Sequence, residues 1–490
     1  MKLQGDIKRK REEALMKIGS KTLTNQGPVV DKKEFAERRQ RFISKLLPNS
    51  VAIIVSNPEQ VRSNDVHFPY RQSSDLLYLS NFPEPQSLLI LTNLKGMPEF
   101  MMFVRPKDRA REIWTGKRFG DEGAKRFFGP DLAHTVDKFP VVLKELLAKA
   151  DNVYYKYGRN EEFDHQFSNE WIGLSRTLLN PDDILREMRI VKSKAEVDQM
   201  RYAGSISAEA HCLAMKICRP GMFEYQIQAE MERIFLMKGA RSPAYASIVA
   251  GGANAITLHY VENSAILKDG DLVLIDAGCE YAGYASDVTR TFPVNGTFTR
   301  AQQEIYELVL EAQMSVIESA KPGRTLAELH DLASGVFRRG LIRYGVLGPE
   351  MKTKESEAKA QEKTNHNGKV STQVVLMDLF MHGTSHWLGL DVHDLWTTGT
   401  RSRYGKTLPL KPGMVFTVEP ALYFEPTDKR LPHKYRGIGV RIEDDVVITK
   451  NGCEVLSSGV PKTIKEIEQL MGSDKEPRAY RTRSARKRPA

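Results

Sequence analysis

Short apolar runs alternate with longer amphipathic stretches along the chain, and this pattern predicts a protein of mixed α/β class. Near the N-terminus, polar and apolar positions at helical spacing predict a helix over residues 31–47, which Pro48 ends. The apolar runs 51–55, 87–91 and 100–104 have the length and composition of buried strands. The first part of the chain therefore reads as a small α/β domain.

Longer helical patterns dominate the second part of the chain. Pro181 is favoured at a helix start, and Asp182 and Asp183 follow it in the first turn, where they suit the helix dipole. We therefore expect the domain boundary near this point, with one domain at 31–177 and a second at 178–472. In the second domain the predicted helices are 194–217, 224–237, 300–319 and 326–344.

Three stretches are expected to be loops. Residues 69–75 and 111–116 are polar and aromatic, which is typical of packing or binding loops between strands. Residues 352–369 are almost entirely polar and read as a solvated insertion rather than a site.

Composition limits the class of protein. The 490 residues are 41% hydrophobic, enough for two domains with substantial cores. The apolar runs fall far short of the roughly 20 residues that a membrane span needs, and the charged first thirty residues do not resemble a secretory signal. The chain has four cysteines, too few for a disulfide scaffold and without paired metal-site spacing. We therefore expect a cytoplasmic protein that does not contact membranes.

The net charge of +10 comes mainly from the two ends of the chain. Residues 1–22 carry seven Lys or Arg against three acids, and residues 474–490 carry seven against two. The body between them is nearly neutral, so we expect flexible basic tails at 1–30 and 473–490. Such tails attract polyanions without defining an activity, and a neutral body argues against a dedicated nucleic-acid enzyme.

Three histidines, His382, His386 and His393, fall within twelve residues of a chain that has only 11 in all. Imidazole is both a common metal ligand and a group suited to proton transfer near neutrality. A zinc helix of the His-x-x-x-His type fits poorly, because Gly383-Thr384-Ser385 fills the gap and none of these is a strong helix former. The partners of these histidines must come from elsewhere in the chain.

Four acids are candidate partners. Asp276 ends the apolar strand 272–276, and Asp287 follows eleven residues later beyond a glycine-marked turn, so the two can lie side by side. Glu419 ends a short apolar strand just before a proline, and Glu443 shares the polar face of the alternating stretch 437–444 with Arg441.

Each of these acids alone is more often a turn former or a solvent-facing residue than a functional group. Together they indicate a metal site, because two carboxylates forced together repel each other unless a cation lies between them. Carboxylates with a single imidazole suit two hard or borderline divalent ions rather than one structural zinc.

The motifs around these residues resemble the pita-bread metallopeptidases, and most closely the aminopeptidase P group. The resemblance covers about residues 33–471 and leaves only the basic tails outside. It rests on Ile275–Gly278, Ser286–Pro293, His382–Asp394, Val418–Pro420 and Arg441–Asp444, and in the N-terminal domain on Tyr70–Asp75 and Glu112–Gly116. It implies an N-terminal aminopeptidase P-type domain followed by a pita-bread catalytic domain.

The resemblance also implies roles for single residues. The ligands of a dinuclear centre, usually manganese, would be Asp276, Asp287, His386, Glu419 and Glu443. Asp287 and Glu443 would bridge both ions. His259, His382 and His393 would line the substrate pocket, and Arg441 and Tyr245 would support the ligands. Trp114 is the candidate contact with a neighbouring subunit, since relatives are often dimers or tetramers. Local departures, at Ala250–Ala253 and in the long 352–369 insertion, touch none of the ligands.

The expected activity is release of the N-terminal residue from peptides with proline in the second position. Two adjacent ions would deprotonate a bridging water, and the hydroxide would attack the Xaa-Pro carbonyl carbon. Glu419 would transfer the proton and His393 would stabilise the tetrahedral oxyanion. Asp276 would help hold the free α-amine, which enforces exopeptidase action, and His382 would help wall the proline pocket.

Three other functions are weighed against this one. Prolidase shares all five ligands, but the Trp387 motif and the Trp114 loop look more like aminopeptidase P. A non-catalytic binding module of the same fold would suit the basic tails, yet such relatives lose ligands that this chain keeps. Creatinase-like chemistry without metal is disfavoured for the same reason.

Overall fold

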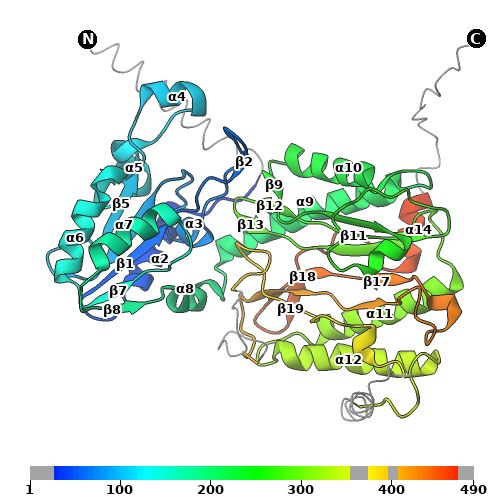
Figure 1. The fold of residues 1–490 in the computed structure, drawn as a ribbon. Helices are drawn as coiled ribbons and strands as arrows, with labels where there is room; N and C mark the ends of the chain where they lie inside the picture. The colour runs from blue at the N-terminus through cyan, green and yellow to red at the C-terminus, as the bar shows by residue number, and fades with distance from the viewer. Residues whose placement is uncertain (1–26, 354–372, 396–406, 473–490) are drawn as a thin grey trace, which may run out of the picture. The chain divides into compact units, whose positions relative to one another are not determined.

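The computed structural model describes residues 27–353, 373–395 and 407–472, which fold into two compact units (Figure 1). The N-terminal unit contains residues 27–199 and the short segment 389–395. The C-terminal unit contains the described residues of 200–388 and 407–472. Both combine helices with sheets, which confirms the α/β class. Most of the predicted basic tails and of the 352–369 insertion lies outside the described residues.

The N-terminal unit is built on a six-stranded mixed sheet with the order β6-β5-β4-β1-β7-β8. β1 pairs antiparallel with β4, and β4 with β5, whereas the remaining pairs are parallel. The strands predicted in this part of the chain are β1, β4 and β5. The bounds are β1 (Ser50–Val55), β4 (Leu88–Thr92), β5 (Phe100–Val104), β6 (Leu132–Thr135), β7 (Asn152–Tyr154) and β8 (Thr177–Leu179).

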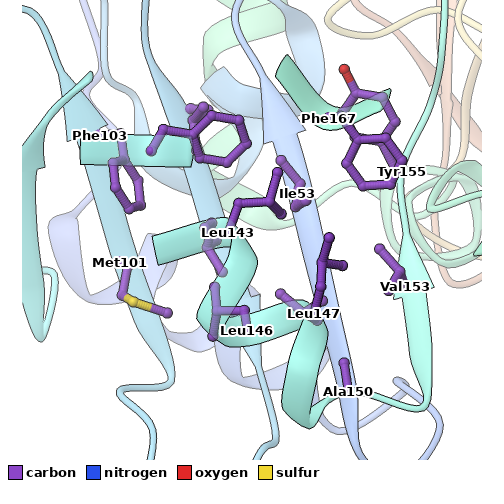
Figure 2. Close-up of a cluster of buried hydrophobic side chains, with 14 of the residues drawn as sticks. Ile53, Met101, Phe103, Leu143, Leu146, Leu147, Ala150, Val153, Tyr155 and Phe167 are labelled. Atoms are coloured by element: carbon purple, nitrogen blue, oxygen red, sulfur yellow. The ribbon is translucent and has the colours of Figure 1, made fainter. Parts of the chain in front are cut away.

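An apolar core covers one face of this sheet (Figure 2). Helices α6 (Phe139–Lys149) and α7 (Glu161–Trp171) supply one side of it and the strands supply the other. Tyr155 and Phe167 stack with ring centroids 4.2 Å apart and planes 13° from parallel. Each large apolar side chain buried here stabilises the unit by about 1.5–3 kcal/mol.

Helix boundaries differ from the sequence expectation where side-chain caps decide them. α2 (Lys32–Ile43) begins at the capping residue Asp31, which accepts from the Lys33 amide at 2.7 Å, but it ends before Pro48. Residues 109–115, where a loop was expected, form α4 (Arg109–Thr115). Asp108 caps that helix by accepting from the two amides that follow it at 3.0 and 3.2 Å.

The division between the units falls between Gln199 and Met200, inside α9 (Lys194–Ile217), rather than at the expected 177/178. β8 pairs with β7, so it extends the N-terminal sheet. α8 (Asp182–Arg189) is held to the same unit, since the Tyr78 hydroxyl donates to the Met188 carbonyl at 3.1 Å. The helix that looked like the start of the second domain therefore completes the first.

In the C-terminal unit the strands lie between α9 and α10 (Glu224–Met237) on one side and α11 (Arg300–Ser319) and α12 (Leu326–Arg343) on the other (Figure 1). The sheets have the orders β10-β11-β14, β15-β18-β19 and β16-β17. Their strands are β10 (Ile248–Gly251), β11 (Leu272–Asp276), β14 (Thr289–Pro293), β15 (Val415–Val418), β16 (Ala421–Tyr423), β17 (Gly439–Arg441), β18 (Asp444–Ile448) and β19 (Cys453–Val455).

Two backbone features place the acids. β11 pairs antiparallel with β14 so that Asp276 faces Thr289. The turn between them passes very close to its own start: a Cβ on Gly278 would lie 2.6 Å from the carbonyl carbon of Ser286, so only glycine fits there. The expected single strand over 437–444 is instead two, because β17 pairs with β16 whereas β18 pairs with β15.

Among the described helices, none has both the length and the apolar character required to cross a membrane. The four cysteines are all free thiols.

Candidate metal centre

The five expected ligands all belong to the C-terminal unit. Asp276 ends β11, Asp287 lies two residues before β14, Glu419 follows β15, and Glu443 lies between β17 and β18. His386 is held alongside β15, since the Thr417 amide donates to the His386 carbonyl at 2.9 Å. Four strand ends and one loop therefore converge from distant parts of the sequence.

These side chains lie close to one another. His386 Nε2 is 3.3 Å from Asp287 Oδ2 and 3.7 Å from Glu419 Oε1. One ligand atom from each of Asp287, His386 and Glu443 lies within 4.8 Å of the others, a spacing that a single ion can span. We refer to Asp276, Asp287, His386, Glu419 and Glu443 as the candidate metal centre.

Tyr245 and Arg441 tie the carboxylates together. The Tyr245 hydroxyl is 2.6 Å from Asp276 Oδ1 and 2.6 Å from Asp287 Oδ1, so it bridges the two acids. Arg441 donates to Asp276 Oδ2 at 2.6 Å and to the Thr289 hydroxyl at 3.2 Å. Thr289 in turn donates to Glu443 Oε2 at 2.7 Å. The relative positions of the acids are thus set by hydrogen bonds within the protein.

The hydrogen bonds of the two nearby histidines fix how each ring is oriented. His386 Nδ1 is 3.1 Å from the Trp387 carbonyl, which can only accept, so Nδ1 donates and Nε2 faces Asp287 and Glu419. This is the orientation that a metal-binding histidine requires. His382 Nδ1 likewise donates to the Gly383 carbonyl at 2.8 Å.

His382 is also the last acceptor in a chain of hydrogen bonds that begins at Arg441. Arg441 Nη1 donates to the Tyr423 hydroxyl at 2.6 Å, and that hydroxyl donates to His382 Nε2 at 3.0 Å. Burial, helped by the charge of Arg441, lowers the pKa of His382 to about 3, so its imidazole is neutral. Glu419 Oε2 lies 3.5 Å from His382 Nδ1.

The carboxylates of the candidate metal centre have too little positive charge around them. Burial raises the pKa of Glu419 to about 7; Asp287 and Asp276 add to the rise, while His386 and Arg441 oppose it. Burial and three neighbouring acids raise the pKa of Glu443 well above its usual range. Three buried carboxylates, the half-buried carboxylate of Glu419 and one imidazole form a donor set that fits divalent cations, which relieve this repulsion.

A further layer of residues, absent from the sequence-based set, holds these ligands. The Asp287 amide donates to both carboxylate oxygens of Asp445 at 3.1 Å. Arg290 and Asp444, both fully buried, form an ion pair at 2.7 Å. The acidic run Glu443-Asp444-Asp445 was the signal in the sequence for this layer. Tyr423 and Thr289 carried no comparable signal, because a tyrosine or a threonine is an ordinary residue in a strand.

The other predicted site residues lie in different surroundings. His259 is exposed in the turn that follows the short helix η2 (Gly252–Ile256). Trp114 lies on α4 of the N-terminal unit and is 87% exposed. His393 is exposed in the segment 389–395, which belongs to the N-terminal unit. Their predicted contacts with substrate or with another subunit stay predictions.

Comparison with known families matches this architecture. The metallopeptidase family M24 matches residues 198–450, slightly more than half of the chain, and the aminopeptidase P N-terminal domain matches residues 35–154. The chain therefore belongs to metallopeptidase family M24, a family whose name implies a divalent metal. This confirms the resemblance seen in the sequence and the predicted class of enzyme.

Within that family the chain is similar to Xaa-Pro aminopeptidases. It is 42% identical to the Xaa-Pro aminopeptidase of Escherichia coli (strain K12), over 90% of this chain and 98% of that protein. It is 34% identical to Xaa-Pro aminopeptidase 3 of Homo sapiens, over 90% of this chain and 86% of that protein.

Solved structures show the same likeness. Pseudomonas aeruginosa aminopeptidase PepP matches with a TM-score of 0.82 at 44% identity, covering 91% of this chain and 98% of that one. A substrate complex of Escherichia coli aminopeptidase P matches with a TM-score of 0.82 at 40% identity, covering 91% and 99%.

Proposed function

We propose that this protein is an Xaa-Pro aminopeptidase that releases the N-terminal residue from peptides with proline in the second position. The observation that carries the proposal is the complete donor set of four carboxylates and one imidazole in the C-terminal unit. The similar proteins of Escherichia coli and Homo sapiens, named Xaa-Pro aminopeptidases, support the substrate class. A binding module of the same fold would have no need of this buried acidic set.

The proposed cofactor is a pair of divalent ions, with Mn²⁺ as the favoured metal. Asp287, His386 and Glu443 would hold the metal together, since one ligand atom of each lies within 4.8 Å of the others. The resemblance to the family implies that Asp287 and Glu443 would be shared by both ions, and Asp276 and Glu419 would complete the donor set. When bound, two such ions lower the pKa of water and polarise a carbonyl group.

The protein's own side chains would then orient the substrate and move the proton. Glu419, beside His382 and His386, is suited to accept a proton from water and to deliver it to the departing proline nitrogen. Neutral His382, fixed by the Tyr423 hydroxyl, would border the proline ring. His393 would donate to the carbonyl oxygen as charge develops on it, and His259 would contact the peptide.

Exopeptidase action requires a group that recognises a free α-amine. Asp276 is suited to this, since Tyr245 and Arg441 fix its carboxylate in place. The protein is also proposed to form a dimer or tetramer through a contact that includes Trp114, which is unusually exposed for its size. A cytoplasmic location stays part of the proposal, and cell fractionation would test it.

The direct test is Mn²⁺-dependent hydrolysis of the tripeptide Arg-Pro-Pro compared with the dipeptide Arg-Pro. Much faster release of arginine from the tripeptide is expected. A strong preference for the dipeptide would instead identify a prolidase. Failure to cleave either peptide with metal bound would reject the peptidase function.

A further inference from the structure

The chain leaves the C-terminal unit directly after the expected ligand His386. Leu388 belongs to the C-terminal unit, whereas Gly389 begins a short segment, residues 389–395, that is part of the N-terminal unit. His393, predicted to contact the substrate, lies in this segment. What holds the 389–395 segment in place is therefore relevant to the proposed chemistry.

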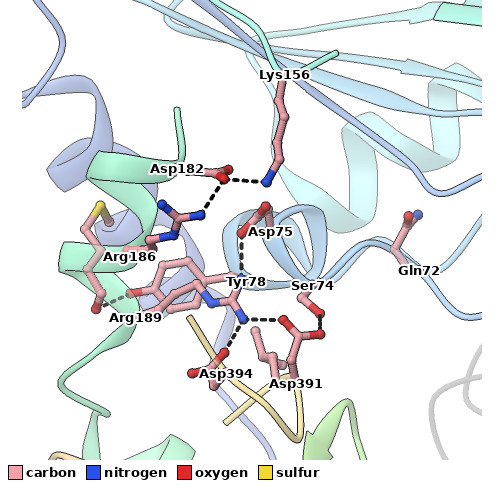
Figure 3. A network of polar contacts seen from close by, with 12 residues as sticks. Gln72, Ser74, Asp75, Tyr78, Lys156, Asp182, Arg186, Arg189, Asp391 and Asp394 are labelled. Atoms are coloured by element: carbon pink, nitrogen blue, oxygen red, sulfur yellow. Dashed lines mark hydrogen bonds and ion pairs between the residues drawn. The ribbon is translucent and has the colours of Figure 1, made fainter. Parts of the chain in front are cut away.

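A partly buried group of charges holds it (Figure 3). Arg189, the last residue of α8, donates to Asp394 Oδ1 at 2.6 Å and to Asp391 Oδ2 at 2.9 Å. Its other terminal nitrogen donates to Asp75 of α3 (Ser74–Ser80) at 2.7 Å. Lys192 adds a second contact to Asp394 at 3.1 Å. We call Arg189, Lys192, Asp75, Asp391 and Asp394 the Arg189 cluster.

Further hydrogen bonds reinforce the same segment. Arg71 donates to the Leu390 carbonyl, and Ser74 donates to Asp391 Oδ1 at 2.6 Å. Gly389 permits the tight packing, because a Cβ there would lie 2.9 Å from Asp394 Cγ and 3.1 Å from Lys192 Cε. The segment is thus attached at its beginning, its middle and its end to α3, to α8 and to the residues next to them.

These attachments bury some side chains of the segment and leave His393 exposed. The Asp394 side chain is 1% exposed and the Lys192 side chain 2%, whereas His393 is exposed. Leu395, which follows, has a φ of +57°, a conformation that only the surrounding contacts can maintain in a residue other than glycine. A planar guanidinium that binds several carboxylates in fixed directions specifies one conformation of the segment.

We propose that Arg189 is a positioning residue of the peptidase. By binding Asp391 and Asp394 it fixes the backbone on both sides of His393, and so sets the place from which that imidazole acts. Apolar side chains would bury the same surface at less cost in desolvation, but they lack this directional control. The inference rests on the proposed function, and it adds a positioning residue to it.

The test is a double-mutant cycle in the full-length, Mn²⁺-loaded enzyme with Arg-Pro-Pro as substrate. Asp394→Asn is expected to lower kcat by about tenfold or more, since a displacement of the order of 1 Å can cost up to about a hundredfold. In a His393→Ala background the same substitution is expected to change kcat by less than about twofold, because the group it positions is already gone.

A matched control lies one turn away on α8. Arg186 forms an ion pair with Asp182 at 2.9 Å, which also binds Lys156, and neither Asp182 nor Lys156 belongs to the 389–395 segment (Figure 3). Arg186→Met is expected to retain the wild-type kcat. If it lowers kcat as much as Asp394→Asn does, the effect is general destabilisation of the unit and the proposal is overturned. Asp391→Asn, at a less buried position, provides a milder variant should Asp394→Asn fold poorly.

A second readout does not depend on activity. Amide hydrogen exchange in the 389–395 segment is expected to accelerate in Asp394→Asn while it stays unchanged in Arg186→Met. Unchanged exchange, or a full loss of kcat that persists in the His393→Ala background, would overturn the positioning role. If the wild-type enzyme cleaves no Xaa-Pro peptide, the proposed function fails, yet the exchange experiment still shows whether the Arg189 cluster holds the segment.

Discussion

The two units each bury a dense group of charged side chains, but only one group is balanced. In the Arg189 cluster the three carboxylates face Arg189 and Lys192, and Arg71 adds a third positive charge 3.7 Å from Asp391. In the candidate metal centre four carboxylates face only Arg441 and His386. Although burial alone would raise the pKa of Asp391, the attraction of Arg189 and its other partners lowers it. In the metal centre the pKa of Glu443 is instead raised.

The direction of the pKa shift therefore distinguishes the two kinds of buried charge. A carboxylate whose pKa is lowered has its countercharge within the protein, and the group is complete as it stands. In the candidate metal centre Glu443 lacks that countercharge, and a bound cation would supply it. The first arrangement holds a backbone segment, and the second prepares a site for metal chemistry.

The largest expected loss of activity follows from removing a carboxylate of the candidate metal centre. Glu419→Ala is expected to lower kcat for Arg-Pro-Pro by about a hundredfold to ten-thousandfold, the usual contribution of a general acid or base. Loss of a metal ligand would add to this. Steady-state kinetics together with metal analysis measures both effects. Glu425→Ala, at an exposed position in the same unit, should behave as wild type. An active Glu419→Ala enzyme would contradict the role given to this residue.

Without metal, the uncompensated carboxylates of the candidate metal centre should make the stability of the fold depend on pH. Burial raises the pKa of Glu419 to about 7. The pKa of His386 is raised to about 9, because Asp287 and Glu419 outweigh the effect of burial on this residue. Protonation therefore stabilises the metal-free fold below the ordinary pKa of each group. This stabilisation is lost as the pH rises through about 7 for Glu419 and through about 9 for His386. For Glu419 the loss in the free energy of unfolding is up to about 3 kcal/mol.

Bound cations favour the deprotonated carboxylates, so the loaded enzyme should not lose stability in this way. The difference in Tm between loaded and chelator-treated protein is expected to be roughly 5 °C larger near pH 8 than near pH 5.5. Thermal unfolding at both pH values measures it. A difference that stays constant with pH would show that the carboxylates do not lack a countercharge.

A balanced group within the C-terminal unit provides the next contrast. Burial opposes the charge of Asp444, but Arg290 and Lys462 outweigh it and lower its pKa to about 2. Asp444→Asn leaves Arg290 buried without its ion-pair partner and is expected to destabilise the fold by roughly 3–5 kcal/mol. Chemical denaturation of the metal-depleted protein measures the change. In the wild type this contribution is lost only as the pH falls through about 2, the opposite direction to that of Glu419.

Much of the fold and the acids of the site could be predicted from local pattern alone. β11 is an unbroken apolar run that ends in Asp276, and its bounds agree with the expected strand. The long helices α9 and α10 match the expected bounds because their apolar periodicity and flanking stop signals agree. Residues that end such elements were recognisable as chemical candidates for the same reason.

What could not be predicted depends on contacts between distant segments. Arg441 and Glu443 were expected on one face of a single strand, yet the chain changes its pairing partner between them. Arg441 therefore reaches Asp276 from one strand, while Glu443 meets Thr289 beyond its end. The attachment of residues 389–395 to Arg189 involves positions about two hundred apart in sequence, which no local periodicity records.

The smallest effect is expected from charges that belong to neither buried group. The basic residues of 1–26 and 473–490 supply most of the net charge. A truncated protein comprising residues 27–472 keeps Pro28, whose carbonyl accepts from the Gln199 side chain at 2.6 Å. Its kcat/KM for Arg-Pro-Pro at physiological salt is expected to lie within about twofold of the full chain, because the sequence predicts flexible tails and charges in solvent are screened beyond about 8 Å. A tenfold loss would mean that the ends of the chain contribute to the active enzyme. Activity would then depend on more than the charges of the Arg189 cluster and the candidate metal centre.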